Sequence, residues 1–109
     1  KVDISSWSFP DKDTKESIRN IQNEFGYLID PHTAVGVLGL IKYRNETNSI
    51  TNGVVLSTAH PGKFADVIEP IIGNKTALPD SLQIAMKKEK NSIKMPKKFS
   101  DLKEYLLAV

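Results

Sequence analysis

The side chains most capable of chemistry gather in one short stretch, which reads STAHPGK over residues 57–63. It holds two hydroxyls, an imidazole and an ammonium group, carried by Ser57, Thr58, His60 and Lys63. An apolar run precedes the stretch and a helical pattern follows it, so we expect it to join a strand to a helix. Such connections bind ligands in α/β sheets, and the free amides at a helix start attract anions. The same residues also suit a capped helix start, in which Thr58 or His60 satisfies the first amides.

Three more specific kinds of site receive little support from the residue pattern. A phosphate-binding P-loop needs glycine at position 57 and a hydroxyl at position 64, where the chain has Ser57 and Phe64. A metal site made of Asp30, His32 and His60 lacks any supporting local spacing, so no metal is expected. A hydrolase site made of Ser57, His60 and Asp30 lacks the GxSxG motif. A ligand site and a capped helix start therefore both stay open.

A helix is predicted over residues 13–25. Asp13 is expected to cap it, because Glu16 three residues later completes the spacing of a capping box. Gly26 is expected to end it at the C′ position. Its apolar residues share one face: Ile18, Ile21 and Phe25.

A second helix is predicted to begin at Asp30-Pro31 and to extend to about Arg44. Asp30 suits the N-cap and Pro31 the first helical position. Apolar residues surround this helix almost completely, which indicates that it lies inside a larger structure. Gly36 and Gly39 leave room for another backbone to approach it closely.

The run over residues 53–57, GVVLS, is predicted to be a buried strand. It is continuous, apolar and rich in β-branched residues, which is typical of a strand covered on both faces in a parallel sheet. Val2–Ile4 and Tyr27–Ile29 are weaker strand candidates. A lone strand is not stable in water, so either this strand pairs within a dimer or the rest of its sheet lies outside the chain.

Helices are also predicted in the C-terminal half of the chain. A helical stripe covers residues 64–72, and Pro70 inside it is expected to kink or loosen the helix. A short helix is predicted from about Ser81 to Lys88, followed by a lysine-rich linker. Ser100 is expected to cap a last helix with three apolar residues on one face: Leu102, Tyr105 and Leu106.

Composition excludes several classes of protein. The 109 residues carry a net charge of +2 and include no cysteine, which rules out disulfides and a thiol nucleophile. The chain has no apolar run near the roughly 18 residues that span a bilayer, and its first residues have no signal-peptide pattern. We therefore expect a cytoplasmic protein without a membrane partner.

The positive charge is concentrated near the C-terminus. Seven lysines and two acidic residues lie between Lys87 and Lys103, so that stretch carries +5. A nucleic-acid interface would interleave arginines or several aromatic residues, whereas every cation here is lysine and the nearby rings are Phe99 and Tyr105. The pattern favours a solvated tail over the alternative of a nucleic-acid binder.

Two segments resemble motifs of a known enzyme family. YLIDPHTAVG at residues 27–36 and LSTAHPGKF at residues 56–64 are similar to the two C-terminal motifs of threonine synthases, pyridoxal-phosphate enzymes of fold type II. Gly62 stands where that family commonly has alanine. The resemblance is good over residues 14–73, whereas residues 87–109 are interpreted as a basic variable tail. It implies that residues 1–109 are a mostly helical C-terminal part of a three-layer α/β/α fold like that of the tryptophan synthase β subunit.

The resemblance implies roles for individual residues. Thr58 matches the hydroxyl residue that hydrogen-bonds the pyridine nitrogen of the cofactor, and Ser57 is a second candidate for cofactor binding. His60 and Lys63 match positions that face the substrate or its phosphate. For residues 30–33, DPHT, a helix-start role and an active-site contact are both open. The family's Schiff-base lysine lies in its N-terminal portion, so no catalytic residue is expected in this chain, which should be inactive alone.

The resemblance also implies the reaction and the partners. The family converts O-phospho-L-homoserine and water to L-threonine and phosphate with pyridoxal phosphate as cofactor. The expected partner is the N-terminal remainder of the same enzyme, and a dimer or swapped assembly of this chain is also open. The alternative is a stand-alone α/β module for ligand binding or dimerisation.

Overall fold

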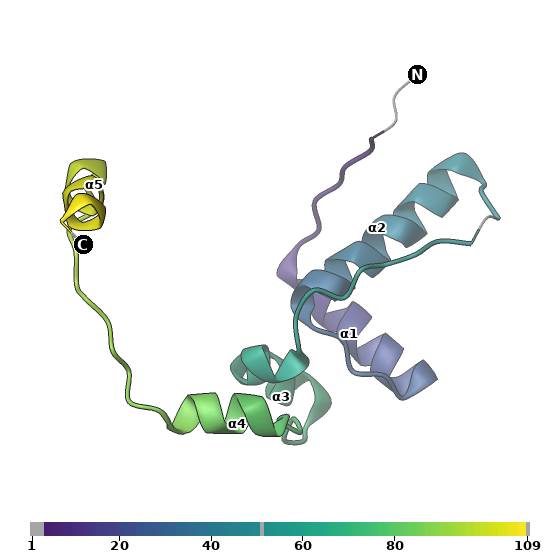
Figure 1. Cartoon of the computed structure of the whole chain (residues 1–109). Helices are drawn as coiled ribbons and strands as arrows, with labels where there is room; N and C mark the ends of the chain where they lie inside the picture. Colours follow the sequence, from purple (N-terminus) through teal and green to yellow (C-terminus); the bar gives the residue numbers. More distant parts are fainter. Residues whose placement is uncertain (1–3, 51, 109) are drawn as a thin grey trace. The chain divides into compact units, whose positions relative to one another are not determined.

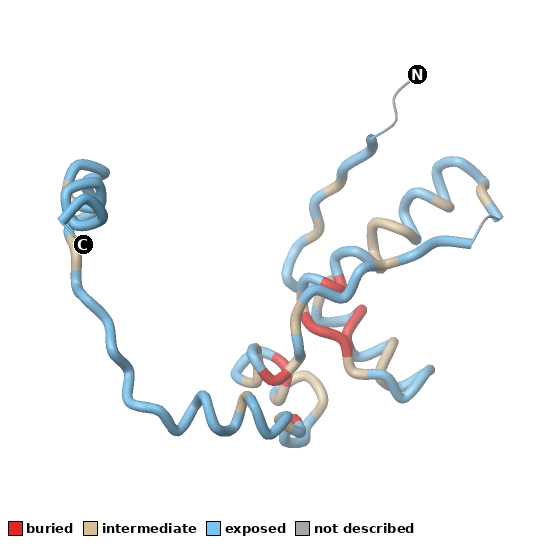
Figure 2. Tube along the Cα trace, in the orientation of Figure 1, coloured by how far each residue is buried: buried red, intermediate tan, exposed pale blue. Residues whose placement is uncertain are grey.

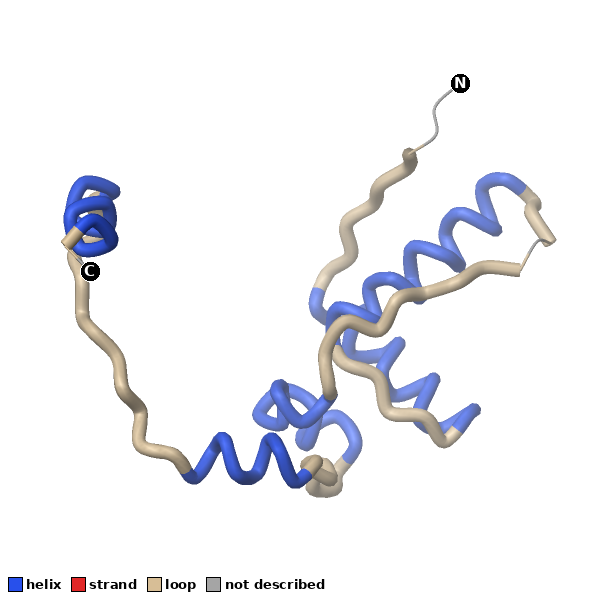
Figure 3. Tube along the Cα trace, viewed as in Figure 1, coloured by secondary structure: helices blue, strands red, loops and turns tan. Residues whose placement is uncertain are grey.

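The computed structural model describes residues 4–50 and 52–108, which fall into two compact units that divide between Pro79 and Asp80. The first unit contains α1 (Asp11–Phe25), α2 (Pro31–Thr47), the 3-10 helix η1 (Pro61–Phe64) and α3 (Ala65–Ile72). The second unit contains α4 (Asp80–Lys87) and α5 (Phe99–Leu107) (Figure 1). The described chain is thus mostly helical, as predicted, and it contains no β-strand (Figure 3).

Helix α1 begins two residues before its predicted start. The amides of Asp13 and Thr14 donate to the carbonyl of Pro10 at 3.0 and 3.2 Å, so Pro10 is the N-cap residue. The capping role predicted for Asp13 is therefore wrong, because Asp13 already lies within the first turn. The helix ends at Gly26 as predicted, with φ of 65°, a left-handed conformation that costs glycine little.

Helix α2 begins as predicted. Asp30 is its N-cap and accepts a hydrogen bond from the amide of His32 at 2.9 Å, and Pro31 is the first helical residue. The helix continues past Arg44 to Thr47. Local sequence chemistry therefore fixes its start, which is the end that faces the candidate site.

The predicted strand over residues 53–57 is an extended segment without a strand partner among the described residues. It runs back along α2 in the opposite direction (Figures 1 and 3). A Cβ atom at Gly36 would lie 2.9 Å from Val55 Cγ1, and a Cβ atom at Gly53 would overlap Leu40. The neighbour of Gly36 is thus the side chain of Val55 and not a backbone, and no described atom lies within 4 Å of a Cβ atom built at Gly39, so the predicted close approach of another backbone is not found at either glycine.

The opposite side of this segment faces solvent. Val54 is 87% exposed and Leu56 is 77% exposed, so the prediction of burial on both faces is wrong for this chain. A strand also requires hydrogen bonds to a second extended backbone, and α2 cannot supply them because its own amides are engaged. Of the weaker strand candidates, Tyr27–Ile29 is a loop, and Val2 and Asp3 lie outside the described residues.

The core of the first unit lies where α1, α2 and α3 meet (Figure 2). Ile18, Ile29 and Ala34 are buried there. The predicted apolar face of α1 is confirmed at Ile18 but is wrong at Phe25, which is 65% exposed. In α2 the buried residues lie in the first turn, so this chain encloses one end of that helix and not its whole length.

Helix α3 follows η1 directly. Phe64 belongs to η1, so the predicted helical stripe is divided between two helices. Ile68 is fully buried and Ile71 packs against the core of the first unit. Pro70 lies inside α3, and the helix continues beyond it to Ile72.

The second unit holds two short helices without a buried residue. Helix α4 agrees with its prediction to within one residue at each end. Helix α5 begins at Phe99 with Lys98 at the N-cap, so the capping role predicted for Ser100 is wrong; its hydroxyl donates to Asp101 at 3.0 Å instead. Across the described chain, each helix is too short or too polar to cross a membrane.

Candidate functional site

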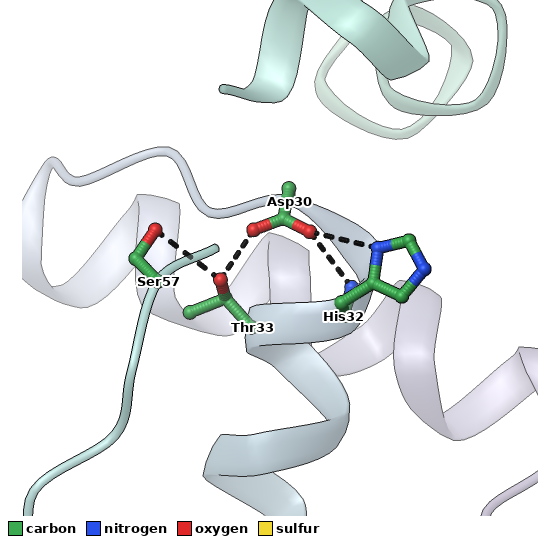
Figure 4. A network of polar contacts seen from close by, with 4 residues as sticks. All are labelled: Asp30, His32, Thr33 and Ser57. Carbon is green, nitrogen blue, oxygen red and sulfur yellow. Dashed lines mark hydrogen bonds and ion pairs between the residues drawn. The ribbon is translucent and has the colours of Figure 1, made fainter. Parts of the chain in front are cut away.

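A buried carboxylate lies at the start of α2. Asp30 has no exposed surface, and its Oδ1 atom accepts the amide of His32 at 2.9 Å and the ring Nδ1 of His32 at 3.1 Å. Its Oδ2 atom accepts the hydroxyl of Thr33 (Figure 4). Both carboxylate oxygens are thus held by the first turn of the helix that Asp30 caps.

These hydrogen bonds keep Asp30 ionised. Burial by itself raises the pKa of a carboxyl group because it penalises the charged form. The hydrogen bonds from Thr33 and His32 outweigh burial, so the pKa of Asp30 lies below its ordinary value of 3.8. Near neutral pH this carboxylate has no proton to give and serves as an acceptor only.

The site extends from α2 to the segment that precedes η1. Thr33 Oγ1 and Ser57 Oγ lie 3.3 Å apart (Figure 4). Thr33 has a single hydroxyl proton, which it donates to Asp30, so the hydrogen bond between the two hydroxyls uses the proton of Ser57. Two hydrogen bonds in series therefore run in one direction: Ser57 donates to Thr33, and Thr33 donates to Asp30.

The remaining predicted site residues lie just beyond Ser57. Thr58, His60 and Lys63 are all exposed. His60 Nδ1 accepts the amide of Gly62 at 3.0 Å and caps η1, so the capped helix start is confirmed and His60 provides the cap. An accepting Nδ1 carries no proton, which leaves the proton of the neutral ring on Nε2.

The two histidines have different surroundings. The His32 ring lies beside Asp30, and its centroid is 5.2 Å from that of Phe64 at an interplanar angle of 59°. His60 binds the amide of Gly62 instead, so the hydrolase arrangement of Ser57, His60 and Asp30 is not formed. Among the residues described, no group of three His, Cys, Asp or Glu side chains could hold a metal ion.

Thr33 is the site residue to which sequence reasoning assigned no specific contact. Asp30 and Thr33 are three residues apart, which is the spacing of a capping box, so a local signal for their contact was present. The contact of Thr33 with Ser57 has no such signal, because it depends on how the segment returns along α2.

A family model described as threonine synthase, C-terminal, matches residues 33–106. The chain belongs to this family. The threonine synthase of Serratia marcescens is 31% identical over 91% of this chain and 22% of that protein. The match confirms the family resemblance, and it includes the STAHP segment at residues 57–61.

Two solved structures are similar to this chain. The threonine synthase of Escherichia coli superposes with a TM-score of 0.75 at 32% identity, over 90% of this chain and 22% of that one. A threonine synthase of Brucella melitensis, described as bound to PLP, gives a TM-score of 0.60 at 32% identity, over 85% of this chain and 19% of that one. The chain thus spans about a fifth of the length of the threonine synthases that it matches.

Proposed function

We propose that this chain is the C-terminal part of a pyridoxal-phosphate-dependent threonine synthase, which converts O-phospho-L-homoserine and water to L-threonine and phosphate. The family match supports this proposal, and so does the similarity to the PLP-bound Brucella enzyme. The observation that carries it is the exposed hydroxyl of Thr58, on a segment that Ser57 ties to α2. We assign residues 14–73 to the part that matches the catalytic fold and residues 87–109 to a basic variable tail.

Thr58 suits a contact with the pyridine nitrogen of the cofactor. Its hydroxyl is neutral and exposed, and it can hydrogen-bond the nitrogen without a carboxylate's tendency to hold a proton there. When bound, pyridoxal phosphate supplies an electron sink for the reaction, and this contact tunes it. Ser57, the second candidate, already uses its hydroxyl to bind Thr33.

The cofactor phosphate does not fit the start of α2. A helix start attracts anions through its free amides, but the Asp30 carboxylate already occupies that position. A second anion there would meet a buried negative charge. The cofactor phosphate is therefore not placed at the start of α2. The family resemblance implies that its binding loop, and the lysine that binds the cofactor covalently, lie in the remainder of the enzyme.

His60 and Lys63 are the proposed substrate contacts. Lys63 is exposed within η1, and its ammonium group suits the phosphate of O-phospho-L-homoserine. Because His60 Nδ1 accepts the amide of Gly62, only Nε2 is available to the substrate. His60 would therefore donate one hydrogen bond through Nε2 while its other nitrogen holds η1.

The remainder of the enzyme is the proposed partner. Val54 and Leu56 expose apolar side chains on the side of the segment that faces away from α2. Strands beside the edges of the segment would supply the missing backbone hydrogen bonds, and a helical layer on the face opposite α2 would bury these side chains, which would complete a three-layer fold. The short span of this chain within its relatives supports that partner.

The proposal is tested with the full-length protein and the 109-residue chain side by side. We expect the full-length protein to release phosphate and form threonine only when loaded with cofactor, and the short chain to do neither. Size-exclusion chromatography combined with an absorbance titration reports cofactor binding by each. Stoichiometric cofactor binding by the short chain would contradict the proposal and favour a stand-alone ligand-binding module.

The role of Thr58 is tested by two variants of the full-length enzyme. Thr58→Val removes the hydroxyl and keeps the shape, so we expect a shifted cofactor absorbance and a lower kcat. Thr58→Ser keeps the hydroxyl and should retain the wild-type absorbance. A wild-type spectrum and rate for Thr58→Val would contradict the assignment.

A further inference from the structure

Alternate residues of the segment before η1 face α2. A Cβ atom at Gly53 would overlap Leu40, Val55 approaches Gly36, and Ser57 contacts Thr33. This two-residue period is that of an extended backbone, in which neighbouring side chains point to opposite sides. Val54 and Leu56, on the other side, are strongly exposed. Thr58 is exposed as well, and the same period extended by one residue turns its side chain away from α2.

We propose that Asp30 and Thr33 are positioning residues for the cofactor contact of Thr58. They hold the side chain of Ser57 against α2, and the side chain of Thr58 is thereby turned outward. The inference rests on the proposed function, because it assumes that Thr58 meets the cofactor. Neither Asp30 nor Thr33 needs to touch the cofactor or the substrate.

The direction of the hydrogen bonds explains how the positioning works. Asp30 is fully buried and has no proton to give, so Thr33 must donate to it and can only accept from Ser57. The proton of Ser57 is therefore committed to α2. Of the two neighbouring hydroxyls, only that of Thr58 can donate toward a ligand, which selects Thr58 over Ser57 as the donor to the cofactor.

Two variants of the full-length enzyme test the role of these directed hydrogen bonds. Asp30→Asn keeps an N-cap, because asparagine caps helices as well as aspartate does. Its amide group can donate to Thr33, however, and so reverse the direction of the hydrogen bonds. Thr33→Val removes the link while keeping the shape of the side chain. Thr33→Ser is the matched control, since it restores the hydroxyl.

The readouts are the cofactor affinity of the apoenzyme, the cofactor absorbance, kcat and KM measured separately, and the Tm of the apoenzyme. We expect Asp30→Asn and Thr33→Val to weaken cofactor binding on the order of tenfold, the factor that one ordinary hydrogen bond is worth, and to shift the absorbance toward that of Thr58→Val. The KM for O-phospho-L-homoserine should change less than kcat. Thr33→Ser should retain wild-type affinity and absorbance.

Opposite outcomes separate this inference from the proposed function. If Thr58→Val shifts the absorbance while Asp30→Asn and Thr33→Val lower only the Tm, the two residues are merely structural and the inference is overturned. If Thr58→Val leaves the cofactor absorbance unchanged, the proposed contact between Thr58 and the cofactor is contradicted, and this inference loses its basis with it. Should Thr33→Val not fold, Ser57→Ala removes the hydrogen bond to Thr33 from the other side, at an exposed residue. A wild-type cofactor absorbance for Ser57→Ala would overturn the inference.

Discussion

The hydroxyl oxygens of Thr33 and Ser57 lie 3.3 Å apart although 24 residues separate them in the chain. This contact joins the start of α2 to the segment that leads to Thr58. Because Thr33 also binds the carboxylate of Asp30, the contact connects the exposed segment that carries Thr58 to a fully buried polar side chain.

Asp30→Asn is expected to remove a pH-dependent part of the stability of the 109-residue chain. The pKa of Asp30 is lower in the folded state than its ordinary value of 3.8. Its carboxylate therefore stabilises the fold above about pH 4 and loses this effect as the pH falls through the folded-state pKa. The difference in unfolding free energy between wild type and Asp30→Asn should shrink from neutral pH to about pH 3, as measured by urea unfolding.

A matched control uses the exposed carboxylate of Asp66 in α3. The stability difference between wild type and Asp66→Asn should change less over the same pH range, because Asp66 is exposed whereas Asp30 is fully buried. If the difference for Asp30→Asn changes no more than that for Asp66→Asn, the hydrogen bonds to Asp30 do not stabilise its ionised form.

Two Gly→Ala substitutions should have opposite effects on the stability of the chain. Gly26 has a φ of 65°, so Gly26→Ala should lower the unfolding free energy by about 1 kcal/mol. Gly39 lies inside α2 with open space where a Cβ atom would lie, so Gly39→Ala should raise it by roughly 0.5–1 kcal/mol. Urea unfolding measures both, and effects of the same sign would contradict the structure.

Substitutions of His60 separate its capping role from its proposed substrate contact. His60→Ala should lower stability by about 1 kcal/mol, because the amide of Gly62 loses its acceptor. His60→Asn offers another good capping acceptor, so it should keep most of the stability. In the full-length enzyme His60→Asn should still raise the KM for O-phospho-L-homoserine; an unchanged KM would leave His60 with the capping role alone.

Isoleucine-to-alanine substitutions test the position of the core. Ile18 has no exposed surface, so Ile18→Ala should lower the unfolding free energy of the 109-residue chain by about 2–5 kcal/mol. Ile50 is 98% exposed, and Ile50→Ala should change it by less than about 0.5 kcal/mol. Similar losses for the two variants would show that the core is not centred on α1.

The features that could be predicted from the sequence are local. Asp30-Pro31 determines the start of α2 because the cap and the first helical residue act within one turn. Gly26 ends α1 because the left-handed conformation that stops a helix is a local preference of glycine. The role of His60 at the start of η1 was one of two local alternatives, and the structure selects it over Thr58.

The features that could not be predicted depend on distant parts of the chain. The segment over residues 53–57 has the composition of a buried strand, but a strand forms only where a second backbone lies beside it. Phe25 fits the apolar stripe of α1, yet it is exposed, because burial of a stripe residue depends on which other elements pack against it. The Thr33–Ser57 contact arises only once that segment has folded back along α2.

The contact between Thr58 and the cofactor is tested most directly by the NMR chemical shift of the pyridine nitrogen, measured with isotopically labelled pyridoxal phosphate in the full-length enzyme. A hydrogen bond from the hydroxyl of Thr58 to this nitrogen predicts one shift for wild type and Thr58→Ser and a different one for Thr58→Val. Identical nitrogen shifts in all three proteins would contradict the contact and, with it, the proposed role of this segment in the active site.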